Sequence, residues 1–195
     1  MSLIPDFELG FWNAWIFMGP SLLFMLLCFL VMMKKDAPGG PARVTCKSKF
    51  TLLVASLSKI IYFPAVIYSV FLPLELDTVW FYVGLPIMLV GLAGSLVVLV
   101  SWAITPTGEP VTRGLYRYSR HPMYVTMVLM FLGVSIASVS WVFLLFAIIS
   151  GVGVTRPYSV KIEEAQCLGH YGVTYREYMD RTPRWFGIPK SKKRD

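Results

Sequence analysis

Three long stretches of this chain contain no charged residue, and they restrict its fold more than any other feature. They cover residues 11–33, 78–107 and 123–155. An α-helix rises about 1.5 Å per residue, so roughly 20 apolar residues cross the hydrocarbon core of a bilayer. The composition, 56% hydrophobic and 15% charged, is more apolar and less charged than that of a typical soluble domain. The sequence therefore predicts an all-α integral membrane protein.

The apolar stretches and their flanks predict five transmembrane helices in a single membrane domain, residues 1–195. These spans are expected at approximately residues 11–33, 50–72, 78–104, 122–137 and 140–156. The last stretch is too short for two upright spans and a long loop, so we expect a tight hairpin that turns around Ser135 to Ser140. Lys59 lies within the second span, either as a functional group or as a lysine that extends to the interface.

Charge sets the predicted topology. All but one of the 18 lysines and arginines fall in segments assigned to the cytoplasm, Lys59 being the exception. The N-terminus is then outside and the C-terminus cytoplasmic. Lipid headgroups explain the net charge of +7 without nucleic acid as a partner. Short length and the lack of organelle signals favour a prokaryotic inner membrane. The three cysteines are too far apart for a CxxC metal site, so no metal is expected.

The segment before the fourth span carries the densest group of reactive side chains. Residues 114–124 read Gly-Leu-Tyr-Arg-Tyr-Ser-Arg-His-Pro-Met-Tyr. Proline is tolerated in the first turn of a helix, so Pro122 is expected to begin a helix with His121 at its N-terminal edge. Free backbone N–H groups, an imidazole and guanidinium groups then meet at one membrane surface, which suits an anionic ligand group. The arginines could also have no other role than to set the orientation of the protein in the membrane.

A second polar group follows the fifth span. An amphipathic helix is expected over residues 158–168, ended by Gly169 and Gly172, and a second short helix over residues 173–180. Because spans four and five form a hairpin, Glu163 and Glu164 should approach residues 113–124 from the same side. A site shared by the two cytoplasmic ends suits a polar cofactor from the cytosol and an acceptor with a lipid tail. Without further support, both glutamates could be ordinary solvated residues.

An ordered set of motifs in these segments resembles the integral-membrane methyltransferases of the isoprenylcysteine carboxyl methyltransferase and phospholipid methyltransferase group. The set is Gly114-x-Tyr116, Arg120-His121-Pro122-x-Tyr124, Glu163-Glu164, Tyr171-Gly172-x-x-Tyr175-x-x-Tyr178 and Pro183-Arg184. The resemblance covers residues 106–185. It implies S-adenosylmethionine as methyl donor, bound by cytoplasmic segments 105–124 and 156–185 without a Rossmann domain, and an acceptor in or on the bilayer.

The resemblance also implies site residues. Cofactor contacts fall on Gly108, Glu109, Pro110, Val111, Tyr116, His121, Pro122, Met123, Tyr124 and Glu163. His121 and the helix N–H groups would hold the carboxylate or ribose, and tyrosines would cover the adenine or sulfonium. Glu163 would pair with the amino group of the cofactor. Arg156 and Glu164 are the expected catalytic residues.

One departure leaves the acceptor open. In the similar carboxyl methyltransferases an arginine precedes the glutamate aligned with Glu163 by four residues, whereas this chain has Ser159 there. Arg156 or Lys161 could anchor an acceptor carboxylate instead. An isoprenylcysteine-type carboxylate and a phospholipid-type amine therefore both remain possible acceptors.

Two other functions fit parts of the sequence. The Arg-His element and the Tyr-Gly-containing tail also look like those of sterol reductases that use NADPH, although those enzymes are much longer. A non-enzymatic lipid-binding membrane protein is the third hypothesis. The oligomeric state is not indicated by the sequence.

Overall fold

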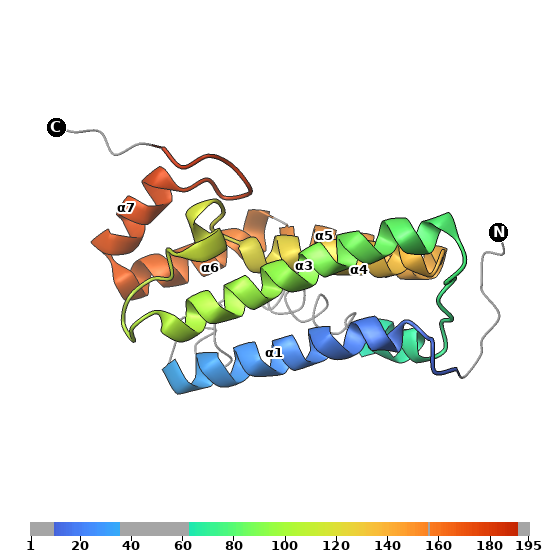
Figure 1. Cartoon of the computed structure of the whole chain (residues 1–195). Helices are drawn as coiled ribbons and strands as arrows, with labels where there is room; N and C mark the ends of the chain where they lie inside the picture. Colours follow the sequence, from blue (N-terminus) through green and yellow to red (C-terminus); the bar gives the residue numbers. More distant parts are fainter. Residues whose placement is uncertain (1–9, 36–62, 156, 191–195) are drawn as a thin grey trace.

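The computed structural model describes residues 10–35, 63–155 and 157–190, and the regular elements in this part of the chain are all helices (Figure 1). Its elements are α1 (Trp15–Lys35), a helical segment at residues 63–70, α3 (Val79–Ile104), the 3-10 helix η2 (Gly114–Arg117), α4 (Pro122–Ala137), α5 (Trp141–Thr155), α6 (Pro157–Tyr171) and α7 (Val173–Arg181). Within the described residues no strand forms beyond one isolated bridge between Asn13 and Pro73. The predicted all-α class is confirmed.

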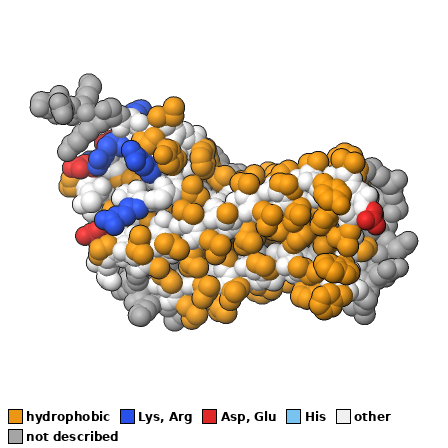
Figure 2. Space-filling view, viewed as in Figure 1, with side chains coloured by type: hydrophobic (Ala, Val, Ile, Leu, Met, Phe, Trp, Pro, Cys, Tyr) orange, Lys and Arg blue, Asp and Glu red, His pale blue; other side chains and the backbone are white. Residues whose placement is uncertain are grey.

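One described helix, α3, is long and apolar enough to cross a membrane. The apolar parts of α1, α4 and α5 are shorter, at Trp15–Val31, Pro122–Ala137 and Trp141–Val152. Large hydrophobic side chains are exposed along α1, α3 and α5, and Figure 2 shows them covering the long body of the molecule. Most of the predicted second span, including Lys59, lies outside the described residues, so the count of five spans stays a prediction.

Glycines allow α3 and α4 to pack backbone against backbone. A Cβ added to Gly84 would lie 2.4 Å from the Ala137 nitrogen, and one added to Gly133 would lie 2.4 Å from the Met88 nitrogen. Both distances are far shorter than any normal carbon–nitrogen contact, so only glycine fits. This close contact fixes where α4 begins relative to the end of α3.

The hairpin between α4 and α5 turns where the sequence predicted. Ser138 to Ser140 connect the helices, and the Ser138 hydroxyl donates to the Val134 carbonyl at 2.7 Å. At the start of α5 the Phe143 N–H donates to the Ser140 hydroxyl at 3.2 Å, which caps the helix. This hairpin returns the chain to the end of the molecule where η2, α6 and α7 lie (Figure 1).

Two predicted boundaries need correction. The first helix begins at Trp15 rather than residue 11. The helix α6 continues through Gly169 and ends at Tyr171, because Gly169 keeps helical geometry and the chain leaves the helix only at Gly172, with φ of 58°. That positive φ favours glycine and separates α6 from α7.

Candidate functional site

The start of α4 forms a histidine corner, which consists of Arg120, His121 and Pro122. Pro122 is the first residue of α4, as the sequence predicted. The His121 N–H donates to the Ser119 hydroxyl at 3.1 Å, and the His121 side chain is buried, with 8% of the residue exposed. The corner is thus a rigid start to the helix, with the imidazole directed into the protein.

Both glutamates of α6 reach this imidazole. His121 Nε2 lies 3.4 Å from Glu164 Oε1, and His121 Nδ1 lies 3.5 Å from Glu163 Oε2. The two polar groups that flank the hairpin in the sequence therefore meet at one end of the molecule, where the charged side chains also gather (Figure 2). The spatial approach predicted for Glu163 and Glu164 is present.

Glu164 sits at the centre of a buried ionic network. Its carboxylate accepts hydrogen bonds from Arg184 Nε at 3.0 Å and Arg184 Nη2 at 2.7 Å, and Arg120 Nη1 lies 3.0 Å away. Only 4% of Glu164 is exposed. Burial alone would raise the pKa of the carboxyl group, but the Arg184 hydrogen bonds and the charges of Arg120 and Arg184 outweigh it and hold the pKa below its usual 4.5. Glu164 is therefore ionised at neutral pH.

Glu163 differs from its neighbour because a ligand can reach it. The Tyr124 hydroxyl donates to Glu163 Oε1, and the Tyr124 ring stacks on the His121 ring with centroids 5.7 Å apart. The Glu163 side chain is nevertheless 39% exposed, against 5% for that of Glu164. The accessible carboxylate of the pair is thus Glu163.

Residues 182–187, here called the C-terminal strap, close over the histidine corner. The Arg120 N–H donates to the Pro183 carbonyl at 3.1 Å, and the Gly187 N–H donates to the Tyr118 carbonyl at 3.0 Å. The Trp185 ring lies 6.0 Å from the His121 ring, centroid to centroid. The site residues predicted from the sequence include neither Arg184 nor Trp185. Arg184 could have been predicted, because Pro183-Arg184 belongs to the motif set of the family that the chain resembles.

Helix α7 anchors the C-terminal strap to η2. The Tyr178 hydroxyl donates to the Tyr116 carbonyl at 2.7 Å, and Tyr175 and Tyr178 are both buried. The Tyr116 hydroxyl accepts a hydrogen bond from Trp102 Nε1 at 2.6 Å. Tyr116 is therefore a buried packing residue in this structure, and burial raises the pKa of its hydroxyl well above the usual value.

The other predicted site residues lie in varied places. Gly108, with φ of 90°, and Glu109 are exposed in the loop after α3, Pro110 is buried, and Val111 and Met123 pack on a cluster around Phe24, Val98 and Tyr116. No hydrogen bond or ion pair among the described residues joins residues 108–111 to His121 or Glu163. Arg156 lies outside the described residues, and Lys161 is exposed on α6. The described chain also contains no group of three His, Cys, Asp or Glu residues that could hold a metal ion.

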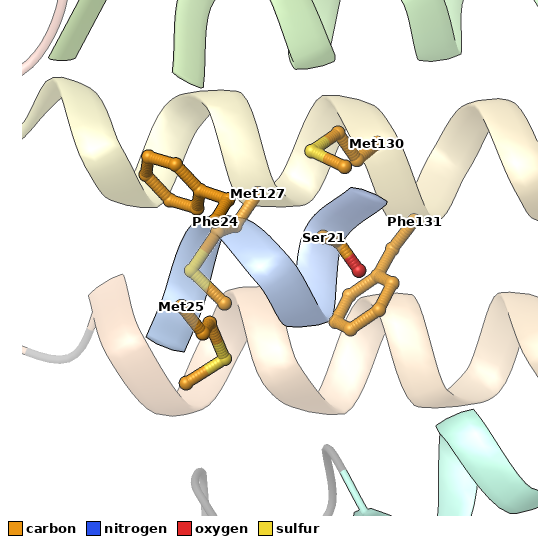
Figure 3. A pocket seen from close by; sticks show the side chains of 6 residues that line it. All are labelled: Ser21, Phe24, Met25, Met127, Met130 and Phe131. Carbon is orange, nitrogen blue, oxygen red and sulfur yellow. The ribbon is translucent and has the colours of Figure 1, made fainter. Parts of the chain in front are cut away.

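A small apolar pocket lies between α1 and α4, away from the histidine corner (Figure 3). Its lining consists of Ser21, Phe24, Met25, Met127, Met130 and Phe131. Met127 follows Met123 by one helical turn, so the pocket continues the α4 face on which Met123 packs. Its lining contains no charged group, so it is not a candidate for binding a polar cofactor.

The depressed pKa of Glu164 predicts a specific pH dependence of stability. A carboxylate whose pKa is lowered by folding stabilises the protein above the usual pKa of 4.5, and this contribution is lost as pH falls through the lower folded value. We expect the melting temperature of the detergent-solubilised protein to fall more steeply below pH 4.5 in the wild type than in Glu164→Gln. Thermal melts between pH 3 and 7 measure this. Parallel curves for the two proteins would contradict the expectation.

The matched part of the chain includes the histidine corner and both glutamates. The family model described as phospholipid methyltransferase matches residues 103–174, from the end of α3 into α7. No curated protein and no solved structure matches the chain. The resemblance found in the motifs is confirmed: residues 103–174 carry the pattern of the phospholipid methyltransferase family.

Proposed function

We propose that this protein transfers a methyl group from S-adenosylmethionine to a lipid-like acceptor at the membrane surface. One observation carries the proposal: His121 lies against both Glu163 and Glu164 at the open end of the α4–α5 hairpin, within the segment that matches the methyltransferase family. The accessible carboxylate of Glu163 would bind the amino group of the donor. The N-terminus of α4 would face its carboxylate.

The chemistry needs alignment more than acid or base catalysis. A lone pair on the acceptor forms a bond to the methyl carbon while the bond from that carbon to sulfur breaks, and the electron pair stays on sulfur as S-adenosylhomocysteine. An amine headgroup first loses the proton of its ammonium form to solvent, because only the neutral amine has a lone pair. In-line displacement is accelerated mainly by holding the reactants in contact and by excluding water. A rigid corner beneath the C-terminal strap, with a buried histidine and aromatic rings, suits this requirement.

The arginines near the histidine corner affect which class of acceptor the site would bind. Arg120 and Arg184 share the single carboxylate of Glu164, which holds both guanidinium groups in place but balances only one of their two charges. Ser159 stands where the carboxyl methyltransferases that the chain resembles have an arginine. The missing arginine favours an amine-type acceptor over a carboxylate, and Arg156 is the residue that could bind a carboxylate instead.

The proposal places the protein in a bilayer with its basic end at the cytoplasmic face. Arg117, Arg176 and Arg181 are exposed around η2 and α7, at the end opposite the α4–α5 turn (Figure 1). Anionic headgroups of an inner leaflet attract such side chains. A prokaryotic inner membrane with the N-terminus outside is the location that we propose.

A transfer assay tests the function. Purified protein is incubated with a donor labelled in its methyl group and with a total lipid extract, and labelled lipids are separated and identified. We expect label in one lipid class with the wild type and none above background with His121→Ala. Label equal in the two proteins, or absent from both, would overturn the proposal. A labelled product with an amine headgroup would identify the acceptor as amine-type rather than carboxylate-type.

A further inference from the structure

Three aromatic rings and one accessible carboxylate meet at the histidine corner. The rings of His121 and Tyr124 are stacked with an angle of 2° between their planes, and Trp185 lies against His121 at an angle of 49°. Glu163 lies beside His121 and Tyr124 and is partly exposed. The face of an indole carries negative potential, so aromatic rings next to a carboxylate form an arrangement that binds organic cations.

Hydrogen bonds of the adjoining residues, rather than contacts of the indole ring, hold Trp185 in this place. On one side of it the Ser119 hydroxyl donates to the Arg184 carbonyl at 3.3 Å, and on the other the Gly187 N–H donates to the Tyr118 carbonyl at 3.0 Å. The Arg184 side chain is fixed by Glu164. A mutation of the indole therefore leaves the attachments of the C-terminal strap in place.

The position of the charges favours a cation beside Glu163. Both arginines of the corner, Arg120 and Arg184, bind Glu164, whereas the described partners of Glu163 are the tyrosine hydroxyl of Tyr124 and the imidazole of His121. A positively charged ligand beside Glu163 would thus contact an accessible carboxylate and the indole face together.

We propose that Trp185 is a residue of the methyl-donor site and that its indole contacts the sulfonium. The inference rests on the proposed function and adds a residue of the C-terminal strap to it. It has a consequence for turnover. Methyl transfer converts the sulfonium into a neutral thioether, so the indole contact favours the donor over the product and assists product release.

Comparison of the charged donor with the neutral product isolates this contact. We would measure binding of S-adenosylmethionine and S-adenosylhomocysteine by calorimetry, in detergent without acceptor, to the wild type, Trp185→Leu and Trp185→Phe. A desolvated cation–π contact predicts about tenfold weaker donor binding by Trp185→Leu. Product binding should change by less than about threefold, and Trp185→Phe should retain most donor affinity because a phenyl ring keeps a π face.

Phe186 supplies the matched control, because it neighbours Trp185 and is exposed. Phe186→Leu should bind both ligands as the wild type does. If Trp185→Leu does not fold, as judged by its thermal melt, Trp185→Met takes its place as a non-aromatic variant with a longer, unbranched and more adaptable side chain. Equal losses for donor and product, or no loss for either, would overturn the role of Trp185 while leaving the proposed function intact. Failure of the wild type to bind either ligand would instead overturn the proposed function.

Discussion

Replacing Glu164 with alanine is expected to produce the largest loss of stability of any single change at the site. The substitution leaves Arg120 and Arg184, which are both partly buried, without their common carboxylate. Removing one partner of a buried ionic network costs about 3–5 kcal/mol of the free energy of unfolding. The C-terminal strap would also lose its side-chain attachment to α6, so residues 182–187 should separate more readily from the histidine corner, while the Tyr178 hydrogen bond still holds α7 against η2.

Thermal melts and limited proteolysis measure this effect, and the chain offers a matched control. Glu177 pairs with Arg181 one turn later on α7, at 3.6 Å, and both side chains are exposed. Exposed pairs of this kind contribute roughly 0–1 kcal/mol, so Glu177→Ala should melt almost as the wild type does. Similar melting temperatures for Glu164→Ala and Glu177→Ala would show that the buried network does not hold the strap.

Replacing Glu163 with glutamine is expected to leave the fold intact and to impair the reaction. The side chain is partly exposed, and an amide oxygen can still accept the hydrogen bond of Tyr124, so the melting temperature should change little. Loss of the charge weakens a hydrogen bond to a cationic amino group by about 1.5–3 kcal/mol. We therefore expect the KM for the methyl donor to rise roughly 10- to 100-fold with a smaller change in kcat.

Steady-state kinetics with varied donor and saturating acceptor separate these two effects. Glu177→Gln removes the same charge from α7 and should keep the wild-type KM. An unchanged donor KM in Glu163→Gln would exclude a direct contact with the donor. A large fall in kcat alone would assign Glu163 to the chemical step.

Local features of the sequence predicted the helices that position the site. Pro122 marked the first residue of α4, and the length of the uncharged stretch required a hairpin with its turn near Ser138. These features depend on residues close in sequence, such as a missing N–H or the number of residues available. They were enough to predict that Glu163 and Glu164 would approach His121.

The division of roles within the site could not be predicted from the sequence. Consecutive residues on a helix point about 100° apart, so Glu163 and Glu164 face different surroundings, and only the fold decides which is buried. The burial of Glu164 depends on Arg184, twenty residues further along the chain. The path of the C-terminal strap depends on contacts such as Arg120 to Pro183 that no periodic pattern encodes.

Calorimetric titration of the purified wild type with S-adenosylhomocysteine would show whether the histidine corner, Glu163 and the C-terminal strap form one cofactor site. We expect saturable binding that weakens in Glu163→Gln and in His121→Ala, with no comparable binding of NADPH. Absence of S-adenosylhomocysteine binding up to millimolar concentration, or binding that neither variant changes, would contradict this expectation.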